Sequence, residues 1–312
     1  MKPSYSVVVP VYNEEGNIRQ LHSEITSVMK SLGSYELIYI NDGSKDNSFK
    51  ELKTLRNTTI INLNRNYGQS TALDAGFKAA KGKIIISMDG DLQNDPKDIP
   101  HLLEKLGREN LDVVTGWRKK RRDNSGIRML TRAGRLLRSI LIKDGVHDTG
   151  CTLRVYRSEA AKSLDLQGEM HRYILALLRW KGFTIGELEV NHRPRIYGKA
   201  KYGPSKAIRG FIDLIYIWFI NKYSQRPLHG FGYLALASVF LSLLSFIESI
   251  IARLSWGLSL NRNGFFYLAF FFAIISILFF SFGIVIDLLI RIYLNTSHNE
   301  KRYYVREIIV RN

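Results

Sequence analysis

Residues 84–93 read Ile-Ile-Ile-Ser-Met-Asp-Gly-Asp-Leu-Gln, an apolar run that ends abruptly in two carboxylates. The apolar half predicts a buried strand over Ile84–Met88, because short β-branched runs bounded by turn residues are typical of parallel sheets. Asp89 and Asp91 then stand two residues apart at the end of that strand, and Gln93 adds another oxygen. Carboxylates so placed can bind a hard divalent cation and share it with a diphosphate, although an Asx turn explains the same pattern.

Apolar runs and helical patterns alternate on both sides of this stretch. The alternation predicts an α/β fold with right-handed βαβ units and a mostly parallel sheet, in which ligands bind beyond the carboxyl ends of the strands. Asn13-Glu14, Asp42 and Asp89-Gly90-Asp91 all fall at such ends. We expect strands at 7–11, 36–40, 59–63 and 112–115 and helices from 13 to 31, from 44 to 55, over 70–80 and over 96–108.

Composition excludes several classes of protein. The 312 residues include 45 Lys and Arg against 28 Asp and Glu, a net charge of +17, and 46% of them are hydrophobic. A chain this apolar is not disordered. The lone Cys151 excludes an intramolecular disulfide framework and a Cys-based zinc cluster, and the first residues lack the pattern of a signal peptide.

Hydropathy changes sharply after Gly230. Residues 230–247 contain no charge over 18 positions, and residues 264–286 contain none over 23. A bilayer core of about 30 Å takes roughly 20 apolar residues as helix, so we expect two transmembrane helices at about 230–252 and 264–290. Two buried core helices are the alternative, but little polar sequence remains nearby to cover them.

These spans divide the chain into a catalytic domain at 1–205, an amphipathic interfacial helix at 206–228, the hairpin at 229–290 and a basic tail at 291–312. Tyr216, Trp218 and Phe219 beside basic residues favour the interfacial helix over a third, shorter span. Most of the excess positive charge lies outside the hairpin, which places the domain and both termini in the cytoplasm of a multi-pass protein in the inner or plasma membrane.

Two basic clusters carry most of the net charge. Residues 118–138 contain nine Lys and Arg with one acid, and residues 193–209 contain six with none. Such clusters suit nucleic acid or an anionic membrane with lipid phosphates. The hairpin favours anionic membrane lipid, and we expect no nucleic-acid partner.

Some polar residues remain ambiguous on their own. Asp42 could accept a hydrogen bond from a nucleotide base or cap the next helix. Asp148, a carboxylate between the two basic clusters, could act as a base, orient an acceptor, or pair with a cation.

Taken in order, the motifs resemble family-2 glycosyltransferases, in particular the branch that acts on polyprenyl phosphates. That branch includes dolichyl-phosphate mannose synthase and the bactoprenol glucosyltransferases. The resemblance extends over about two thirds of the chain and rests on Val9–Glu15, Asn41–Ser44, Asn64–Gly68, Ala72–Gly76, Met88–Gln93, Gly116–Arg118, Asp148–Cys151, His192–Arg195 and Gly198–Gly203.

The resemblance implies a GT-A nucleotide-sugar-binding fold and assigns roles by motif. Nucleotide-sugar binding falls to Pro10, Tyr12, Glu14, Asp42, Asp89 and Gln93, and Mg²⁺ or Mn²⁺ binding to Asp89, Asp91 and Gln93. The catalytic candidates are Asp91, Asp148 and Arg118. Acceptor or diphosphate binding falls to Arg118, Arg132, Arg193, Arg195 and Lys201.

The implied reaction moves a hexose from a nucleoside-diphosphate sugar to polyprenyl phosphate with inversion at the anomeric carbon. UDP-glucose is the first expectation for the donor and GDP-mannose the second, and a homo-oligomer is compatible with the apolar hairpin. A processive polysaccharide synthase is an alternative, but its Gln-x-x-Arg-Trp pattern is broken here by Ala176 before Arg179-Trp180. A non-enzymatic adaptor for anionic lipid is another.

Overall fold

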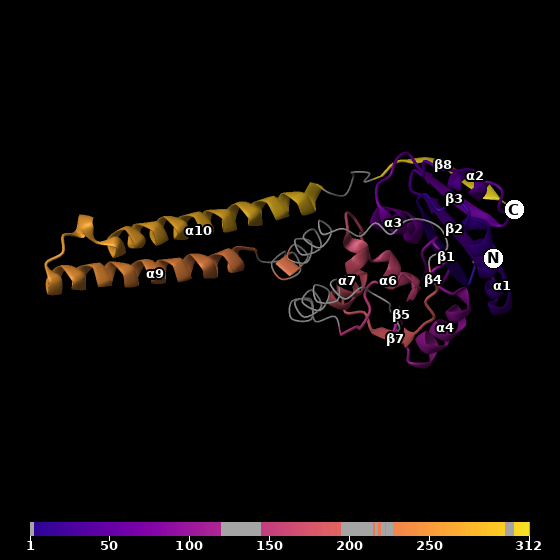
Figure 1. Ribbon diagram of the computed structural model, residues 1–312, viewed down its shortest axis with the longest axis horizontal. Helices are drawn as coiled ribbons and strands as arrows, with labels where there is room; N and C mark the ends of the chain where they lie inside the picture. The colour runs from indigo at the N-terminus through magenta and orange to yellow at the C-terminus, as the bar shows by residue number, and fades with distance from the viewer. Residues whose placement is uncertain are drawn as a thin grey trace. The chain divides into compact units, whose positions relative to one another are not determined.

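The computed structural model describes residues 3–119, 145–194, 227–296 and 303–311, with residues 215, 218, 219 and 222 between them (Figure 1). The chain forms two compact units, Met1–Asp213 with Lys301–Asn312 and Leu214–Glu300. The first unit is therefore discontinuous in sequence, and the second is an insertion into it.

An eight-stranded sheet forms the centre of the first unit, in the order β7-β5-β6-β4-β1-β2-β3-β8. Pairing is parallel from β4 through β1 and β2 to β3 and between β5 and β7, while β6 and β8 run antiparallel to their neighbours. The predicted mostly parallel α/β fold is confirmed. The strands are β1 (Tyr5–Val11), β2 (Tyr35–Asn41), β3 (Thr58–Leu63), β4 (Ile84–Ser87), β5 (Val113–Trp117), β6 (Arg154–Arg157), β7 (Ile185–Glu189) and β8 (Val305–Arg311).

Helices cover both faces of this sheet, because successive strand residues point to opposite faces and both sets are apolar. Val7 and Val9 pack with the first layer, while Val8 packs with the second. The first layer holds α1 (Ile18–Leu32), α2 (Ser48–Leu52) and α4 (Ile99–Arg108), which follows the 3₁₀ turn η1 (Pro96–Asp98). The second holds α3 (Gln69–Ala79), α6 (Ser158–Lys162), η2 (Met170–Tyr173) and α7 (Ile174–Trp180).

Two predicted helices are wrong at their ends. The helix expected from Asn13 begins only at Ile18, because Asn13 (φ 56°) and Gly16 (φ 86°) adopt left-handed conformations that a helix does not accept. The helix expected between 44 and 55 is reduced to the five residues of α2. The residues freed from both helices form loops beyond the ends of β1 and β2.

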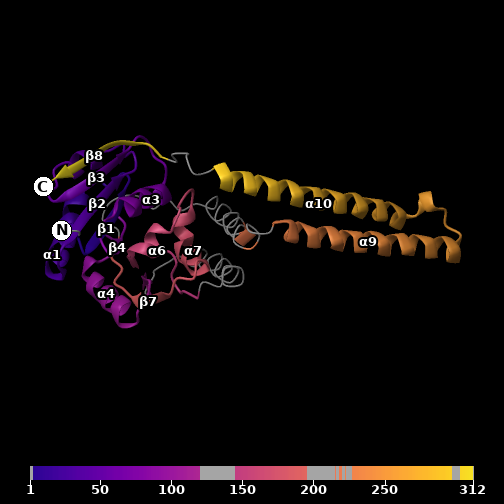
Figure 2. The ribbon, with the colours of Figure 1, turned by 180° about the vertical axis from the view of Figure 1, so that it is seen from behind.

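The C-terminal residues, predicted as a basic tail at 291–312, contain a strand of the first unit. Val305–Arg311 form β8, which pairs antiparallel with β3 at the edge of the sheet, as both views show (Figures 1 and 2). Its β-branched residues suit a strand, and Ile309 packs against the core. The last residues therefore belong to the same folded unit as β1.

The second unit contains α9 (Pro227–Trp256), the 3₁₀ turn η3 (Leu260–Arg262) and α10 (Gly264–Thr296). Two stretches, Leu228–Trp256 and Gly264–Ile290, are long and apolar enough to cross a membrane. Only 17% of the residues in the most apolar window of each are buried, which argues against helices of a soluble core. The Ser242 hydroxyl joins the two helices by donating to the Ala269 carbonyl at 2.7 Å.

The predicted interfacial helix at 206–228 lies mostly outside the described residues. Ile215, Trp218, Phe219 and Lys222 are helical, and the Lys222 ammonium lies 5.2 Å from the centre of the Trp218 ring. A helix in an interface stays a prediction.

Candidate active site

The Asp89 and Asp91 carboxylates lie directly beyond the carboxyl end of β4, as predicted. Asp91 is 5% exposed, and its Oδ1 accepts a hydrogen bond from the Gln93 N–H at 3.1 Å. Asp89 Oδ1 accepts from the Gln69 amide at 2.7 Å. The Asx turn that the sequence offered as an alternative is therefore present at Asp91, and it orients the carboxylate at the strand end.

The backbone next to these carboxylates is strained. Leu92 is 1% exposed and has a φ of +61°, a left-handed conformation that costs a non-glycine residue about 1–2 kcal/mol. Burial of the Leu92 side chain in the core holds this conformation in place. Strain of this kind collects at functional sites, where the surrounding structure fixes the direction of a side chain.

The electrostatics of the two carboxylates fit a divalent cation. Burial, together with the negative charge of Asp91, raises the pKa of Asp89 to about 7. Glu14 adds a further negative charge nearby, whereas Arg118 opposes it. Hard cations prefer carboxylate oxygens and would relieve this repulsion. No group of three or more His, Cys, Asp or Glu side chains able to hold a metal occurs in the described part of the chain.

The loop after β1 reaches the same place. A Cβ built on Gly90 would lie 3.4 Å from the Pro10 carbonyl oxygen and 3.5 Å from Glu14 Cγ. The Glu14 N–H also donates to the Ser48 hydroxyl at 2.8 Å, which fixes this loop to α2. The structure thus brings together the ends of β1 and β4, while Tyr12 is half-buried in the same loop.

Asp42 is a buried carboxylate that organises a third loop. Its Oδ1 accepts from the Tyr67 N–H at 2.7 Å and its Oδ2 from the Gly68 N–H at 2.9 Å. Burial raises the pKa of Asp42, and the two backbone hydrogen bonds oppose that rise. Both Asp42 carboxylate oxygens therefore accept from the loop between β3 and α3, and Asp42 does not cap α2. These bonds hold that loop against the end of β2.

We expect Gly43→Ala to break this arrangement. Gly43 has a φ of +66°, and an added Cβ would lie 2.5 Å from the Arg65 carbonyl carbon and 2.6 Å from the Asn66 nitrogen. Because backbone cannot yield as a side chain does, we expect a loss of about 2 kcal/mol or more in unfolding free energy, measured by chemical denaturation. Gly33→Ala is the control, since Gly33 also has a positive φ but nothing within 4 Å of its Cβ position. Equal losses in the two variants would contradict the close approach.

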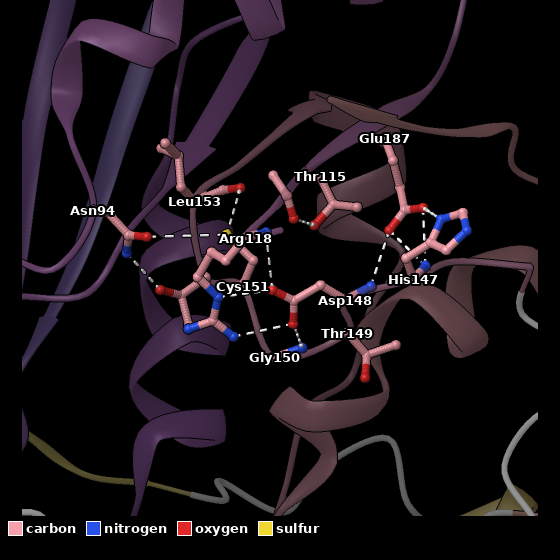
Figure 3. A network of polar contacts seen from close by, with 12 residues as sticks. Asn94, Thr115, Arg118, His147, Asp148, Thr149, Gly150, Cys151, Leu153 and Glu187 are labelled. Carbon is pink, nitrogen blue, oxygen red and sulfur yellow. Dashed lines mark hydrogen bonds and ion pairs between the residues drawn. The ribbon is translucent and has the colours of Figure 1, made fainter. Parts of the chain in front are cut away.

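Arg118 and Asp148 form a two-pronged ion pair, the centre of the network in Figure 3. Arg118 Nε donates to Asp148 Oδ2 at 2.7 Å and Nη2 donates to Oδ1 at 3.0 Å, with side chains 12% and 11% exposed. Although burial opposes it, the Arg118 guanidinium and the Arg118 and Gly150 N–H groups lower the pKa of Asp148. Of the three roles that the sequence left open, the geometry favours pairing with a cation, since a carboxylate of lowered pKa is a weak base.

The lowered pKa of Asp148 predicts a pH dependence of stability. A carboxylate whose pKa is lower in the folded than in the unfolded protein stabilises the fold above the unfolded pKa of about 3.9, and this contribution is lost as the pH falls through the folded pKa. We therefore expect wild type to exceed Asp148→Asn in unfolding free energy by a constant amount between about pH 5 and 8. The difference should begin to shrink below about pH 4 and be lost only once the pH has fallen through the lowered pKa of Asp148, measured by urea denaturation. A difference that shrinks near neutral pH would contradict the pairing.

Arg193 has partners that the sequence did not suggest. Its Nη1 lies 2.6 Å from Glu24 Oε2 and its Nη2 lies 2.7 Å from Asp95 Oδ1. Its N–H also donates to the Gln93 carbonyl at 2.9 Å. Arg193 thus fastens the segment that follows Asp91 to α1, and its predicted role in binding an acceptor stays a prediction. Arg132, Arg195 and Lys201 lie outside the described residues.

Several residues near Asp89 escaped the sequence analysis. Gln69 and Thr152 both donate hydrogen bonds to Asp89. Gln69 and Thr152 line a small pocket together with Arg154 and His171. Burial lowers the pKa of His171 to about 3. His171 therefore stays neutral, and its Nδ1 lies 3.0 Å from the Ser70 hydroxyl. Long-range contacts of this kind leave no local signal in a sequence.

The mostly parallel sheet, with carboxylates beyond the end of β4 and polar loops at neighbouring strand ends, has the architecture of the GT-A fold. Among solved structures, glucosyl-3-phosphoglycerate synthase from Mycobacterium tuberculosis, in complex with Mn²⁺, UDP-glucose and phosphoglyceric acid, has the same fold. The TM-score is 0.54 at 19% identity, over 69% of this chain and 79% of that one.

Sequence comparison gives the family. Glycosyl transferase family 2 matches residues 6–165. Dodecaprenyl-phosphate galacturonate synthase from Rhizobium johnstonii is 38% identical, over 80% of this chain and 78% of that protein. Undecaprenyl-phosphate 4-deoxy-4-formamido-L-arabinose transferase from Shewanella sediminis is 33% identical, over 98% and 92%. The chain belongs to glycosyltransferase family 2, and the predicted resemblance to its polyprenyl-phosphate branch is confirmed.

Proposed function

We propose that this enzyme transfers one sugar from a nucleoside diphosphate to a polyprenyl phosphate, with inversion at the anomeric carbon. The observation that carries the proposal is the extent of the similarity. The Shewanella relative, which is named for an undecaprenyl-phosphate substrate, matches 98% of this chain, so the likeness includes the apolar helices as well as the catalytic domain. A lipid substrate explains why such helices accompany a nucleotide-sugar-binding domain.

The connectivity of the chain supports a two-span hairpin. Residues on both sides of α9 and α10 belong to one folded unit, because β8 joins the sheet of β1–β7. A segment whose two flanks lie in one domain crosses a membrane an even number of times. The basic residues outside the hairpin favour the cytoplasmic side for that domain.

The chemistry places little demand on a base. The acceptor phosphate is already an anion near neutral pH, so positioning and charge stabilisation supply the catalysis. Asp89 and Asp91, with Gln93, would hold Mg²⁺ or Mn²⁺, which neutralises charge on the departing diphosphate when bound. Arg118 would bind the acceptor phosphate through its remaining donors, and Asp148 would orient Arg118.

The names of the relatives indicate which donor sugars to test. The relatives described above are named for galacturonate and for 4-deoxy-4-formamido-L-arabinose rather than for glucose or mannose. UDP-linked sugars are the first donors to test, since UDP-glucose occupies the M. tuberculosis structure of the same fold. A uronic acid and a formamido-pentose belong in the panel beside glucose and mannose.

A donor panel tests the proposal. Membranes that contain the protein are given radiolabelled UDP- and GDP-sugars, polyprenyl phosphate, and either Mg²⁺ or EDTA. We expect label in extractable lipid from one donor and none with EDTA. Absence of lipid label from every donor, with the protein shown to be folded and inserted, would favour a processive synthase or a lipid-binding adaptor.

A further inference from the structure

Strand β8 is the last element that the structure describes, yet it completes the half of the sheet that carries the proposed nucleotide site. It pairs with β3 from Thr58↔Arg311 to Leu63↔Val305. The chain reaches this position only after it has passed through α9 and α10. Strand β3, which ends at the loop that Asp42 binds, is therefore paired along its edge by residues that follow the hairpin.

A chain of side-chain amides links β8 to the loop after β2. Glu307 Oε1 accepts from Asn62 Nδ2 at 3.3 Å, and Asn62 Oδ1 accepts from Asn41 Nδ2 at 2.8 Å. Asn41 Oδ1 accepts in turn from the Ser44 N–H at 3.3 Å. Asn41 and Asn62 are 3% and 4% exposed, so each depends on protein partners for its hydrogen bonds. Within such a network each bond orients the next one.

A second contact reaches the loop after β3. The Asn64 N–H, one residue beyond that strand, donates to the Tyr304 carbonyl at 3.0 Å. The same loop ends at Tyr67 and Gly68, whose N–H groups bind Asp42. Tyr304, the residue just before β8, is thus bonded to one end of the loop that Asp42 holds at its other end.

We propose that β8 is a positioning element for donor binding, in which Glu307 and the Tyr304 carbonyl hold the loops at 41–44 and 64–68 in the conformation that accepts the nucleotide. Return of the chain from the hairpin then becomes a condition for donor binding. The inference rests on the proposed nucleotide-binding role of Asp42, but its structural half concerns the loops alone. Glu307 acts through Asn62 and is a positioning residue, not a catalytic one.

Hydrogen exchange of the full-length protein tests the structural half without any substrate. We expect Glu307→Ala to speed amide exchange at 41–44 and 64–68 about fivefold, the effect of losing roughly one hydrogen bond, with little change elsewhere in the sheet. Glu307→Gln keeps the accepting oxygen and should behave as wild type. Lys53→Met removes the 3.9 Å ion pair with Glu307, together with an ammonium contact to the Phe49 ring, but leaves the hydrogen bond between Glu307 and Asn62. Arg306→Ala alters an exposed neighbour, so both variants should leave these loops unchanged.

Calorimetric binding of UDP with Mn²⁺ tests the functional half. We expect Glu307→Ala to weaken UDP binding about fivefold and Glu307→Gln to restore it. Unchanged exchange at both loops in Glu307→Ala would overturn the proposal, as would equal effects of Glu307→Ala and Lys53→Met. Hydrogen exchange and UDP binding do not involve the lipid acceptor. Failure of sugar transfer to lipid would therefore count against the proposed function and not against this proposal.

Discussion

Asp91→Asn should abolish sugar transfer, with a fall in rate of about 10³-fold or more, while the protein stays folded. The fold should survive because an asparagine Oδ1 can still accept the hydrogen bond from the Gln93 N–H that forms the turn. What is lost is one of two buried negative charges that would hold the divalent cation against the diphosphate. The change therefore separates the charge of the site from its shape.

Transfer assays at saturating Mg²⁺ or Mn²⁺ check this expectation, with circular dichroism as the test of folding. Asp165→Asn is a matched control, because it replaces a 52% exposed carboxylate away from the strand ends. Near wild-type transfer by Asp91→Asn would show that Asp91 does not contribute to catalysis. An equal loss of transfer in Asp165→Asn would show that the effect is not specific to Asp91.

Removal of Arg118 should cost stability as well as activity. Arg118→Met leaves the Asp148 carboxylate, 11% exposed, without its charged partner, and an uncompensated buried charge costs about 3–5 kcal/mol. Two hydrogen bonds of 2.7 and 3.0 Å are lost at the same time. Transfer should fall in parallel, since the guanidinium would also bind the acceptor phosphate.

A double-mutant cycle separates the two effects. Arg118→Met combined with Asp148→Asn removes both charges, so we expect it to recover about 1–3 kcal/mol of the unfolding free energy lost in Arg118→Met. Transfer should stay low in the double variant, because the acceptor phosphate still lacks its cation. Additive losses in unfolding free energy would contradict the coupling, and recovered transfer would contradict the role of Arg118 in binding.

Local pattern was sufficient for much of the fold. Short, mainly apolar runs identify β1 to β5, and the helical period identifies α3 and α4 to within a few residues, because each signal lies within one segment. The start of α1 was wrong because positive φ values at Asn13 and Gly16 are set by the neighbouring loop. Strand β8 was missed because its partner β3 lies more than 240 residues earlier in the chain.

The site was predictable to a similar degree. The ends of parallel strands meet at one edge of a sheet, so the sequence predicts that Glu14, Asp42 and Asp89 lie at the same edge. It could not show that Asp42 binds the Tyr67 and Gly68 N–H groups, or that Arg193 pairs with Glu24. These contacts depend on tertiary packing, which brings distant segments into hydrogen-bond distance.

The most direct test of the central claim is mass spectrometry of the lipid that the purified protein makes from polyprenyl phosphate, a labelled nucleotide sugar and Mg²⁺. The account predicts one product whose mass equals the polyprenyl phosphate plus a single sugar residue, absent with Asp91→Asn or EDTA. A ladder of sugar additions, free sugar alone, or unchanged lipid with a fully folded protein would contradict it.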